Sequence, residues 1–197
     1  MLFLASRSPR RSELLHQLGL RFEVLDVSIQ EIRRAGEPAE DYVSRVAREK
    51  AGAGLLQVGA VAGAVVLGAD TEVVLDGEVF GKPADAVAAA EMLRRLSGRT
   101  HRVVSDLWCL TAAGEAHRSC RSEVSFRTLS EDDIAAYVAT GEPFGKAGGY
   151  AIQGRAAAFV RHLAGSYSGV MGLPLFETAA VLQDMGCRPL DEAAASR

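Results

Sequence analysis

Arginine and serine side chains cluster near the amino terminus, in the run Ser6-Arg7-Ser8-Pro9-Arg10-Arg11 between an expected strand and an expected helix. The amino end of a helix presents unpaired N–H groups and a partial positive charge, so hydroxyl and guanidinium donors there suit phosphate oxygens. The alternative is a capped helix with solvated arginines. Because cations oppose the helix dipole at this end, three of them favour an anionic ligand. The run therefore predicts a phosphate site.

A carboxylate follows an apolar segment further along the chain. Residues 65–67 are branched and aliphatic, which is typical of a strand buried on both faces, and Gly68-Ala69-Asp70-Thr71 comes directly after them. Ligands of open α/β sheets bind beyond the carboxyl ends of strands, where a carboxylate can be a metal ligand or a general base. The alternative is an aspartate that caps a turn. We expect Asp70 at the end of a strand.

Three lysines are further candidates for contacts with phosphate: Lys50, Lys82 and Lys146. Lys82 and Lys146 are on glycine-flanked loops, where the backbone can approach a ligand closely. Taken singly, each lysine is more typical of a solvated surface position. The chain contains neither G-x-x-x-x-G-K-[ST] nor G-x-G-x-x-G, so P-loop and Rossmann sites lack support.

Composition limits the class of protein. The 197 residues are 48% hydrophobic and 24% charged, which predicts one compact domain. We expect this domain to cover residues 1–186, because the residues after Gly186 are typical of a frayed tail, 187–197. A net charge of −3 argues against a large basic surface for nucleic acid. Apolar runs are too short for a membrane helix, and the arginines near the start interrupt any secretory signal. We expect a cytoplasmic protein without nucleic-acid or membrane partners.

The elements that must position these residues alternate between short apolar runs and longer helical patterns, which is typical of an α/β protein. Asp76-Gly77 predicts a hairpin turn, and Ser130 with Asp133 predicts a capping box. The residues 142–153 and 165–172 are expected to be loops. Strands are expected at residues 2–5, 22–27, 65–67, 71–75, 78–80, 101–110, 117–126 and 159–162, and helices at 10–18, 38–56, 84–96, 130–138 and 174–185.

Taken together, these segments resemble the Maf family of nucleoside triphosphate pyrophosphatases, from Leu2 to about Met185. The opening run, residues 4–11, resembles the family signature L-A-S-x-S-P-R-R. The further matches, in order, are AREKA at 47–51, GADT at 68–71, GKP at 81–83, LSGRTH at 96–101, KAGGYAIQG at 146–154, and GSY at 165–167 with GLPL at 172–175.

The resemblance implies an elongated mixed sheet with flanking helices, similar to the inosine triphosphatase group, with two lobes around a central cleft. It also implies cleavage between the α- and β-phosphates, with a divalent metal cation, Mg²⁺ or Mn²⁺. Asp70 with Thr71, and Gln153, resemble the subgroup that acts on dTTP and UTP. The departures from the family pattern, which bear on base preference and metal affinity, are Arg7, Gly145 and Gly169.

These implications assign a role to each candidate residue. Asp70 would accept the proton of the attacking water or hold the metal, with Glu31 as a second metal ligand. Amide and hydroxyl groups can pair with the carbonyl and N–H edge of uracil or thymine, so Arg10, Thr71 and Gln153 would recognise the base. The residues expected to contact the triphosphate are Ser6, Ser8, Arg11, Lys50, Lys82 and Lys146.

Two other functions fit the same residues. One is a non-catalytic nucleotide-binding regulator of septum formation or cell division, and the other is a house-cleaning pyrophosphatase for 7-methyl-GTP or for other modified or purine triphosphates. A carboxylate beside a strongly cationic site favours an enzyme, because a pure anion binder gains nothing from added negative charge. In each case the partner is a nucleotide, and the resemblance is compatible with a homodimer.

Overall fold

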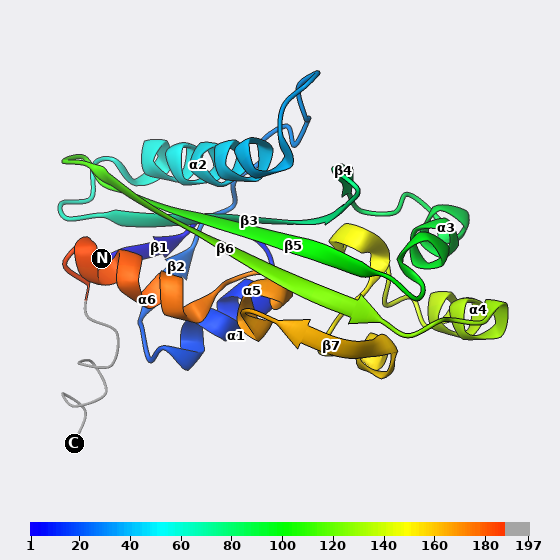
Figure 1. Ribbon diagram of the computed structural model, residues 1–197. Coiled ribbons are helices and arrows are strands. Elements are labelled where there is room, and N and C mark those ends of the chain that lie inside the picture. The colour runs from blue at the N-terminus through cyan, green and yellow to red at the C-terminus, as the bar shows by residue number, and fades with distance from the viewer. Residues whose placement is uncertain (188–197) are drawn as a thin grey trace.

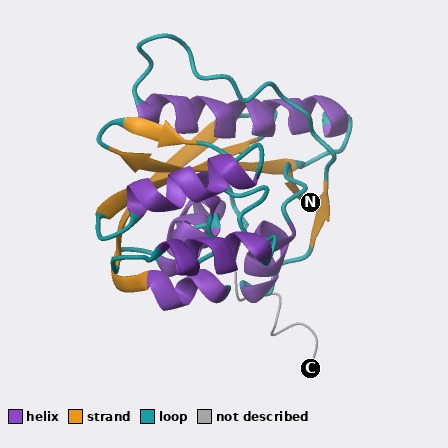
Figure 2. Ribbon diagram, turned by 90° about the vertical axis from the view of Figure 1, so that its right-hand side faces the viewer, coloured by secondary structure: helices purple, strands orange, loops and turns teal. Residues whose placement is uncertain are grey.

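The computed structural model describes residues 1–187, which form one mixed sheet with helices on both faces (Figures 1 and 2). The sheet order is β2-β1-β3-β5-β6-β7, and β4 pairs with β3. The strands are β1 (Leu2–Leu4), β2 (Phe22–Val24), β3 (Val65–Leu75), β4 (Glu78–Phe80), β5 (Thr100–Leu110), β6 (Glu115–Phe126) and β7 (Val160–Ala164). The helices are α1 (Pro9–Gln17), α2 (Ala39–Val58), α3 (Ala86–Leu96), α4 (Glu131–Ala139), α5 (Tyr167–Met171) and α6 (Leu175–Asp184), with 3₁₀ turns η1 (Ala147–Gly149) and η2 (Arg155–Phe159).

Three long antiparallel strands, β3, β5 and β6, run the length of the molecule and give it an elongated shape (Figure 1). The parallel strands β1 and β2 extend the sheet at one end. Near the other end, β4 pairs with β3 and β7 pairs with β6. Helix α2 covers one face, while α1, α5 and α6 lie against the opposite face. The expected α/β class, with a mixed sheet and flanking helices, is confirmed.

Each end of the long strands has its own apolar core. At the α3 and α4 end, Leu93 and Phe126 are buried in one cluster with Tyr150. At the other end, Leu14 of α1 and Leu182 of α6 pack against β1 and β3. These two cores, with smaller clusters under α2, make up the two lobes. Of the expected tail, Cys187 packs against the second core, and residues 188–197 lie outside the described part of the chain.

Strand β3 corrects the prediction of two short strands separated at residues 68–70. It is continuous over Val65–Leu75, and β5 pairs with it from Val66 to Val74. The strand continues through the polar residues 70–72 because this non-local pairing satisfies the hydrogen-bonding groups of their backbone. Asp70 therefore lies in the middle of a strand, and its expected position after a strand end was wrong.

Several other boundaries of helices and strands differ from those predicted from the sequence. The expected loop over residues 165–172 contains the short helix α5, whose first turn is capped by Ser166 Oγ accepting from the Gly169 N–H. Strand β7 is displaced toward Ala164, and β2 ends at Val24 rather than at residue 27. The hairpin at Asp76-Gly77 and the capping box of Ser130 with Asp133 are confirmed. No helix in residues 1–187 is long and apolar enough to cross a membrane.

Candidate active site

A gap in the sheet creates the candidate site. On one edge of β3, β1 pairs with residues 65–67 and β4 pairs with residues 73–75. Between them, no other strand of the described chain pairs with that edge at residues 68–72. Because side chains alternate along a strand, Asp70 and Glu72 point toward α2 while Thr71 points to the opposite face. The gap lets residues from both faces of the sheet reach one cavity of about 330 Å³.

All the residues predicted for the site line this cavity, although they come from separate parts of the chain. The turn before α1, the loop between β2 and α2, the middle of β3 and the loops around η1 each contribute to the lining. The predicted residues that line it are Ser6, Ser8, Arg10, Arg11, Glu31, Lys50, Asp70, Thr71, Lys82, Lys146 and Gln153.

The turn before α1 forms one wall. Ser8 precedes the helix, but neither its side chain nor any other described one caps the first turn. Ser6 Oγ accepts from the Ser8 N–H and from Arg11 Nη1, both at 3.3 Å. Arg11 Nε donates to the Gly172 carbonyl at 2.8 Å, which joins α1 to the end of α5. The uncapped N-terminus of α1 therefore lines the cavity, where its backbone N–H groups are suited to an anion.

An ion-pair network lies on the α2 side of β3. Lys50 Nζ is 2.7 Å from Asp70 Oδ1 and 2.7 Å from Glu31 Oε1, and Lys82 Nζ is 2.7 Å from Glu31 Oε2. Only 10% of the Lys50 side chain is exposed, so this lysine is not a solvated surface residue. Although burial opposes it, hydrogen bonds from Lys50 and Lys82 lower the pKa of Glu31 to about 2.

The loops that carry these charges are fixed by local contacts. Tyr42 of α2 donates through its hydroxyl to the Glu31 carbonyl at 3.1 Å. The Gly148 N–H donates to the Gly81 carbonyl at 3.1 Å, which ties η1 to the loop that carries Lys82. Gly148 has φ +71°, and a Cβ there would lie 2.8 Å from a methyl group of Val73. Only glycine fits where this loop crosses β3.

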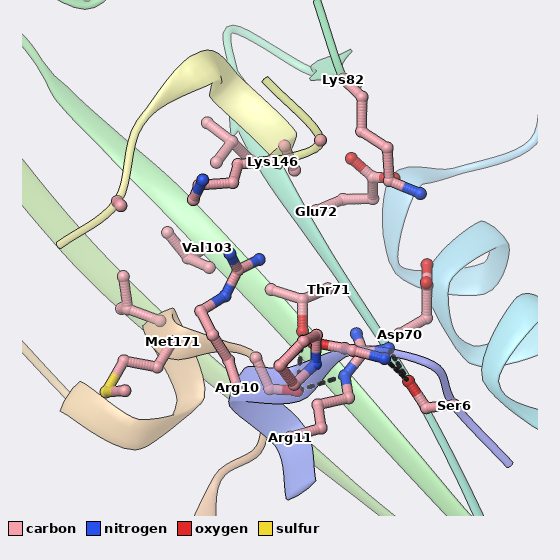
Figure 3. A pocket seen from close by; sticks show the side chains of 18 of the residues that line it. Ser6, Arg10, Arg11, Asp70, Thr71, Glu72, Lys82, Val103, Lys146 and Met171 are labelled. Atoms are coloured by element: carbon pink, nitrogen blue, oxygen red, sulfur yellow. Dashed lines mark hydrogen bonds between the residues drawn. The ribbon is translucent and has the colours of Figure 1, made fainter. Parts of the chain in front are cut away.

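Glu72 is a site residue that the sequence analysis missed. It lines the cavity and is only 6% exposed, and its Oε2 atom has no hydrogen-bond partner among the described residues. Burial, with the nearby Asp70 carboxylate, raises the pKa of Glu72 to about 8. Figure 3 shows Glu72 and Asp70 on the same side of β3, with Lys82 near Glu72. A continuous strand would have revealed this pair, because residues two apart share a face.

On the opposite side of β3, the described site residues include cationic and apolar side chains rather than carboxylates. Arg10 extends between Lys146 and Val103 (Figure 3), and partial burial lowers the pKa of its guanidinium. Lys146 Nζ donates to the Glu142 carbonyl at 2.6 Å, so it is held within its own loop. Gln153 is exposed at the edge of the cavity. The cavity is also lined by the apolar side chains of Val73, Val103, Tyr150, Ile152, Val170 and Met171.

Thr71 has hydrogen-bond partners within the protein. Its Oγ1 is 2.8 Å from Ser105 Oγ on β5 and 3.4 Å from the Gly172 carbonyl. Ser105 Oγ in turn donates to the Gly169 carbonyl at 2.8 Å. Gly169, one of the departures from the family pattern, therefore contributes its backbone here. Of the other departures, Arg7 makes an exposed ion pair with Asp26 at 3.4 Å, and Gly145 has φ +71°.

The carboxylates set what kind of cation the cavity could hold. Residues 1–187 contain no group of three or more His, Cys, Asp or Glu side chains placed to bind a metal. Two buried carboxylate oxygens, Asp70 Oδ2 and Glu72 Oε2, nevertheless lack a partner in this part of the chain. Mg²⁺ is commonly bound by one or two carboxylates together with substrate phosphates. The donor set fits a divalent cation that is completed by a phosphate ligand.

Comparison with known proteins identifies a protein family and several relatives that are similar to this chain. Residues 1–185 match the family model described as Maf-like protein. A nucleoside triphosphate pyrophosphatase of Xylella fastidiosa (strain M23) is 57% identical over 183 residues, 92% of this chain and 97% of that protein. A dTTP/UTP pyrophosphatase of Xanthomonas euvesicatoria pv. vesicatoria (strain 85-10) is 56% identical over 188 residues, which cover 94% of this chain and 99% of that protein. Among solved structures, the Staphylococcus aureus Ham1 protein has a TM-score of 0.42 at 14% identity, covering 66% of this chain and 72% of that chain.

Proposed function

The chain belongs to the Maf-like protein family, and from this premise we propose that it hydrolyses dTTP and UTP to the nucleoside monophosphate and pyrophosphate. Relatives that match nearly its whole length are named for this activity. The observation that carries the proposal is the position of Asp70, a buried carboxylate in the same cavity as the cationic turn before α1. A triphosphate bound to that turn would bring its phosphates close to this carboxylate.

Phosphate binding is assigned to the donors around the turn. Ser6, Ser8 and Arg11 would contact the phosphate oxygens at the start of α1, where the helix adds partial positive charge. Lys82 and Lys146 would reach the chain of phosphates from the loops on the other side of the cavity, and Lys50 from α2. Phosphoryl transfer depends mainly on positioning and charge neutralisation, which such a set of cations provides.

Asp70 is the group that we assign to proton transfer. Lys50 occupies its Oδ1 atom, and Oδ2 is left without a partner among residues 1–187. A water held by Oδ2 would attack the α-phosphorus while its proton passes to Asp70. The bond from the α-phosphorus to the bridging oxygen then breaks, and pyrophosphate leaves with the electron pair.

A divalent cation, Mg²⁺ or Mn²⁺, would be held by Glu72 together with the phosphates. Because Lys50 occupies Asp70 Oδ1, Asp70 Oδ2 would either join the cation as a ligand or accept the proton of the water. When bound, the cation neutralises phosphate charge and lowers the pKa of a coordinated water. Glu31, the second metal ligand expected from the resemblance, has both oxygens in ion pairs with Lys50 and Lys82. It could join the cation only if one of these lysines moved to a phosphate, and Lys82 is the more exposed of the two.

Base recognition is assigned to the opposite side of β3. Arg10 and Thr71 lie near Val103 and Met171 (Figure 3), and Gln153 lines the same cavity. The amide of Gln153 and the hydroxyl of Thr71 can pair with the carbonyl and N–H edge of uracil or thymine. The thymine methyl group would add about 1 kcal/mol at most, so both dTTP and UTP should be substrates.

Pyrophosphate release, measured across a panel of nucleotides with Mg²⁺, tests the proposal. We expect dTTP and UTP to be cleaved with higher kcat/KM than CTP, GTP and ATP. Cleavage of 7-methyl-GTP at least as efficient as that of dTTP and UTP would move the protein to the other pyrophosphatase function. Tight binding of dTTP without any pyrophosphate release would instead favour a non-catalytic regulator. A cytoplasmic location and a homodimer remain predictions that cell fractionation and light scattering can test.

A further inference from the structure

A chain of hydrogen bonds connects Thr71 to the backbone of α5. Thr71 and Ser105 are directly opposite each other on β3 and β5, and their hydroxyl oxygens are 2.8 Å apart. Ser105 is only 2% exposed, and its Oγ lies 2.8 Å from the Gly169 carbonyl oxygen. The chain therefore begins at the wall of the cavity and ends inside the protein.

Proton count limits the direction of the hydrogen bonds in this chain. A hydroxyl has one proton to donate, and a carbonyl oxygen can only accept. Ser105 must therefore give its proton to Gly169, so it cannot donate to Thr71, and Thr71 gives its own proton either to Ser105 at 2.8 Å or to the Gly172 carbonyl. The other partner of Thr71, the Gly172 carbonyl at 3.4 Å, can also only accept. Thr71 consequently has only lone pairs to offer a ligand.

We infer that Ser105 is a positioning residue for base selection, because it fixes Thr71 Oγ1 as a hydrogen-bond acceptor toward the nucleobase. Uracil and thymine carry an N–H donor at N3, which matches an acceptor. Cytosine has an unprotonated N3, which would face the Thr71 lone pairs without a hydrogen bond. The inference rests on the proposed function, since it requires the base to lie against Thr71.

The surroundings of Thr71 make this mismatch costly. Val103, which is 2% exposed, and Met171 line the cavity on the same side of β3 as Thr71. Such apolar walls leave little room for a water to bridge two acceptors, and an unmatched buried acceptor carries a desolvation cost. The fixed direction of the Thr71 hydroxyl would thus favour binding of uracil and thymine over binding of cytosine.

The test is Ser105→Ala, assayed for kcat/KM on UTP, CTP, dTTP and dCTP. Without Ser105 Oγ, only the long 3.4 Å contact with the Gly172 carbonyl holds the Thr71 proton, so the hydroxyl can turn and donate to N3 of cytosine. We expect the preference for UTP over CTP, and for dTTP over dCTP, to fall at least about fivefold. The kcat on UTP should change less than this ratio, because the phosphates and Asp70 are untouched.

Ser122→Ala is the matched control. Ser122 Oγ, on β6, accepts from the Ser166 N–H at 2.9 Å and so anchors the start of α5 without contacting Thr71. We expect this variant to keep the wild-type preference. An equal loss of preference in Ser122→Ala would overturn the inference, because displacement of α5 would then explain both variants. An unchanged preference in folded Ser105→Ala would also overturn it.

Thr71→Val gives a second, independent measurement if Ser105→Ala does not fold. It removes the acceptor itself, so the preference should fall as in Ser105→Ala, and the double variant should lose nothing further. A retained preference in Thr71→Val overturns the inference. Calorimetry with α,β-methylene-UTP and α,β-methylene-CTP measures the same preference as a ratio of Kd values. Failure of the inference therefore remains distinguishable from failure of the proposed hydrolysis.

Discussion

At the scale of single residues, two carboxylate oxygens distinguish this cavity from a simple anion-binding site. Asp70 Oδ2 and Glu72 Oε2 are buried and have no hydrogen-bond partner in the described chain. Buried polar atoms are normally satisfied, so orphaned carboxylate oxygens point to a water, a cation or a ligand that completes them. The following two predictions separate the roles of these carboxylates.

Asp70→Asn should lower kcat on dTTP by about 100-fold or more, because the amide keeps the shape but cannot take up the proton. Binding of α,β-methylene-dTTP should remain close to wild type, since the oxygen of the introduced amide can still accept from Lys50. Asp41→Asn, an exposed position on α2, is the control. If the Asp70 variant retains more than about a tenth of the wild-type kcat, a barrier change below ~1.4 kcal/mol, Asp70 is not the proton acceptor.

Glu72→Gln should weaken Mn²⁺ binding by about tenfold, because Mn²⁺ can displace the proton that the raised pKa of Glu72 retains near neutral pH, whereas an amide offers no negative oxygen. The affinity is measured without nucleotide, from the electron paramagnetic resonance signal of free Mn²⁺. Glu49→Gln, which removes a carboxylate that pairs with Arg45 outside the cavity, should leave the affinity unchanged. Unaltered Mn²⁺ binding in a folded Glu72→Gln protein would remove Glu72 from the cation site.

At the scale of elements, the close approach of α2 to β3 places Lys50 beside Asp70. A Cβ on Gly68 of β3 would lie 2.4 Å from the Ala47 carbonyl oxygen and 2.5 Å from the Ala51 nitrogen. Only glycine allows the helix backbone to come this near to the strand. Lys50 lies between these two contacts along α2, so the distance between helix and strand sets the distance between lysine and carboxylate.

Gly68→Ala should therefore reduce both stability and activity. The added methyl group must push α2 away, which costs about 1–3 kcal/mol or more of the free energy of unfolding and moves Lys50 from Asp70. Gly52→Ala is the matched control in α2, because its Cβ meets nothing within 4 Å. It should stabilise the protein by about 0.5–1 kcal/mol. Urea unfolding and kcat on dTTP measure both effects, and equal stability of the two variants would contradict this packing argument.

At the scale of the whole molecule, two cores share the long strands and the cavity lies between them. His101 of β5 belongs to the α3 and α4 lobe, is 1% exposed, and has its Nε2 atom 2.8 Å from the Tyr150 hydroxyl. Burial lowers the pKa of His101 to about 4. Tyr150 also lines the cavity, so protonation of His101 would disturb the lobe beside the site.

The contribution of His101 to the free energy of unfolding should fall as pH decreases from about 6.5 to about 4, whereas Glu72, with its pKa raised to about 8, contributes in the opposite direction down to about pH 4.5. The unfolded chain binds a proton on His101 in this range and the folded chain does not, so acid favours unfolding. The His101 contribution is at most about 3 kcal/mol. His101→Gln, which keeps a donor for Tyr150, should lose less stability than wild type between pH 6.5 and 4 in urea titrations, whereas the exposed His162→Gln should match wild type. Identical slopes for wild type and His101→Gln would contradict the assignment.

The sequence by itself determined the features that local chemistry controls. Helix α2 follows from its apolar face at Tyr42 and Val46, and the β3–β4 hairpin follows from Asp76-Gly77, whose φ angles of 53° and 80° suit a tight turn. The donors of residues 6–11 were predictable because a helix N-terminus is encoded within a few neighbouring residues. The α/β class was predictable from the alternation of apolar runs and helical patterns, and the family motifs indicated the predicted polar residues of the cavity, but not Glu72.

Tertiary structure alone decided how these residues act together. Pairing of β3 with β5 made one strand of two expected segments, which placed Asp70 and Glu72 on one face and Thr71 on the other. The approach of α2 buried Lys50, and the position of α5 gave Ser105 the carbonyl that orients Thr71. These outcomes depend on contacts between residues far apart in the chain, and periodicity and turn chemistry describe only near neighbours. For this reason most polar residues of the site could be predicted from the sequence, while Glu72, the charge pairs and the proton directions could not.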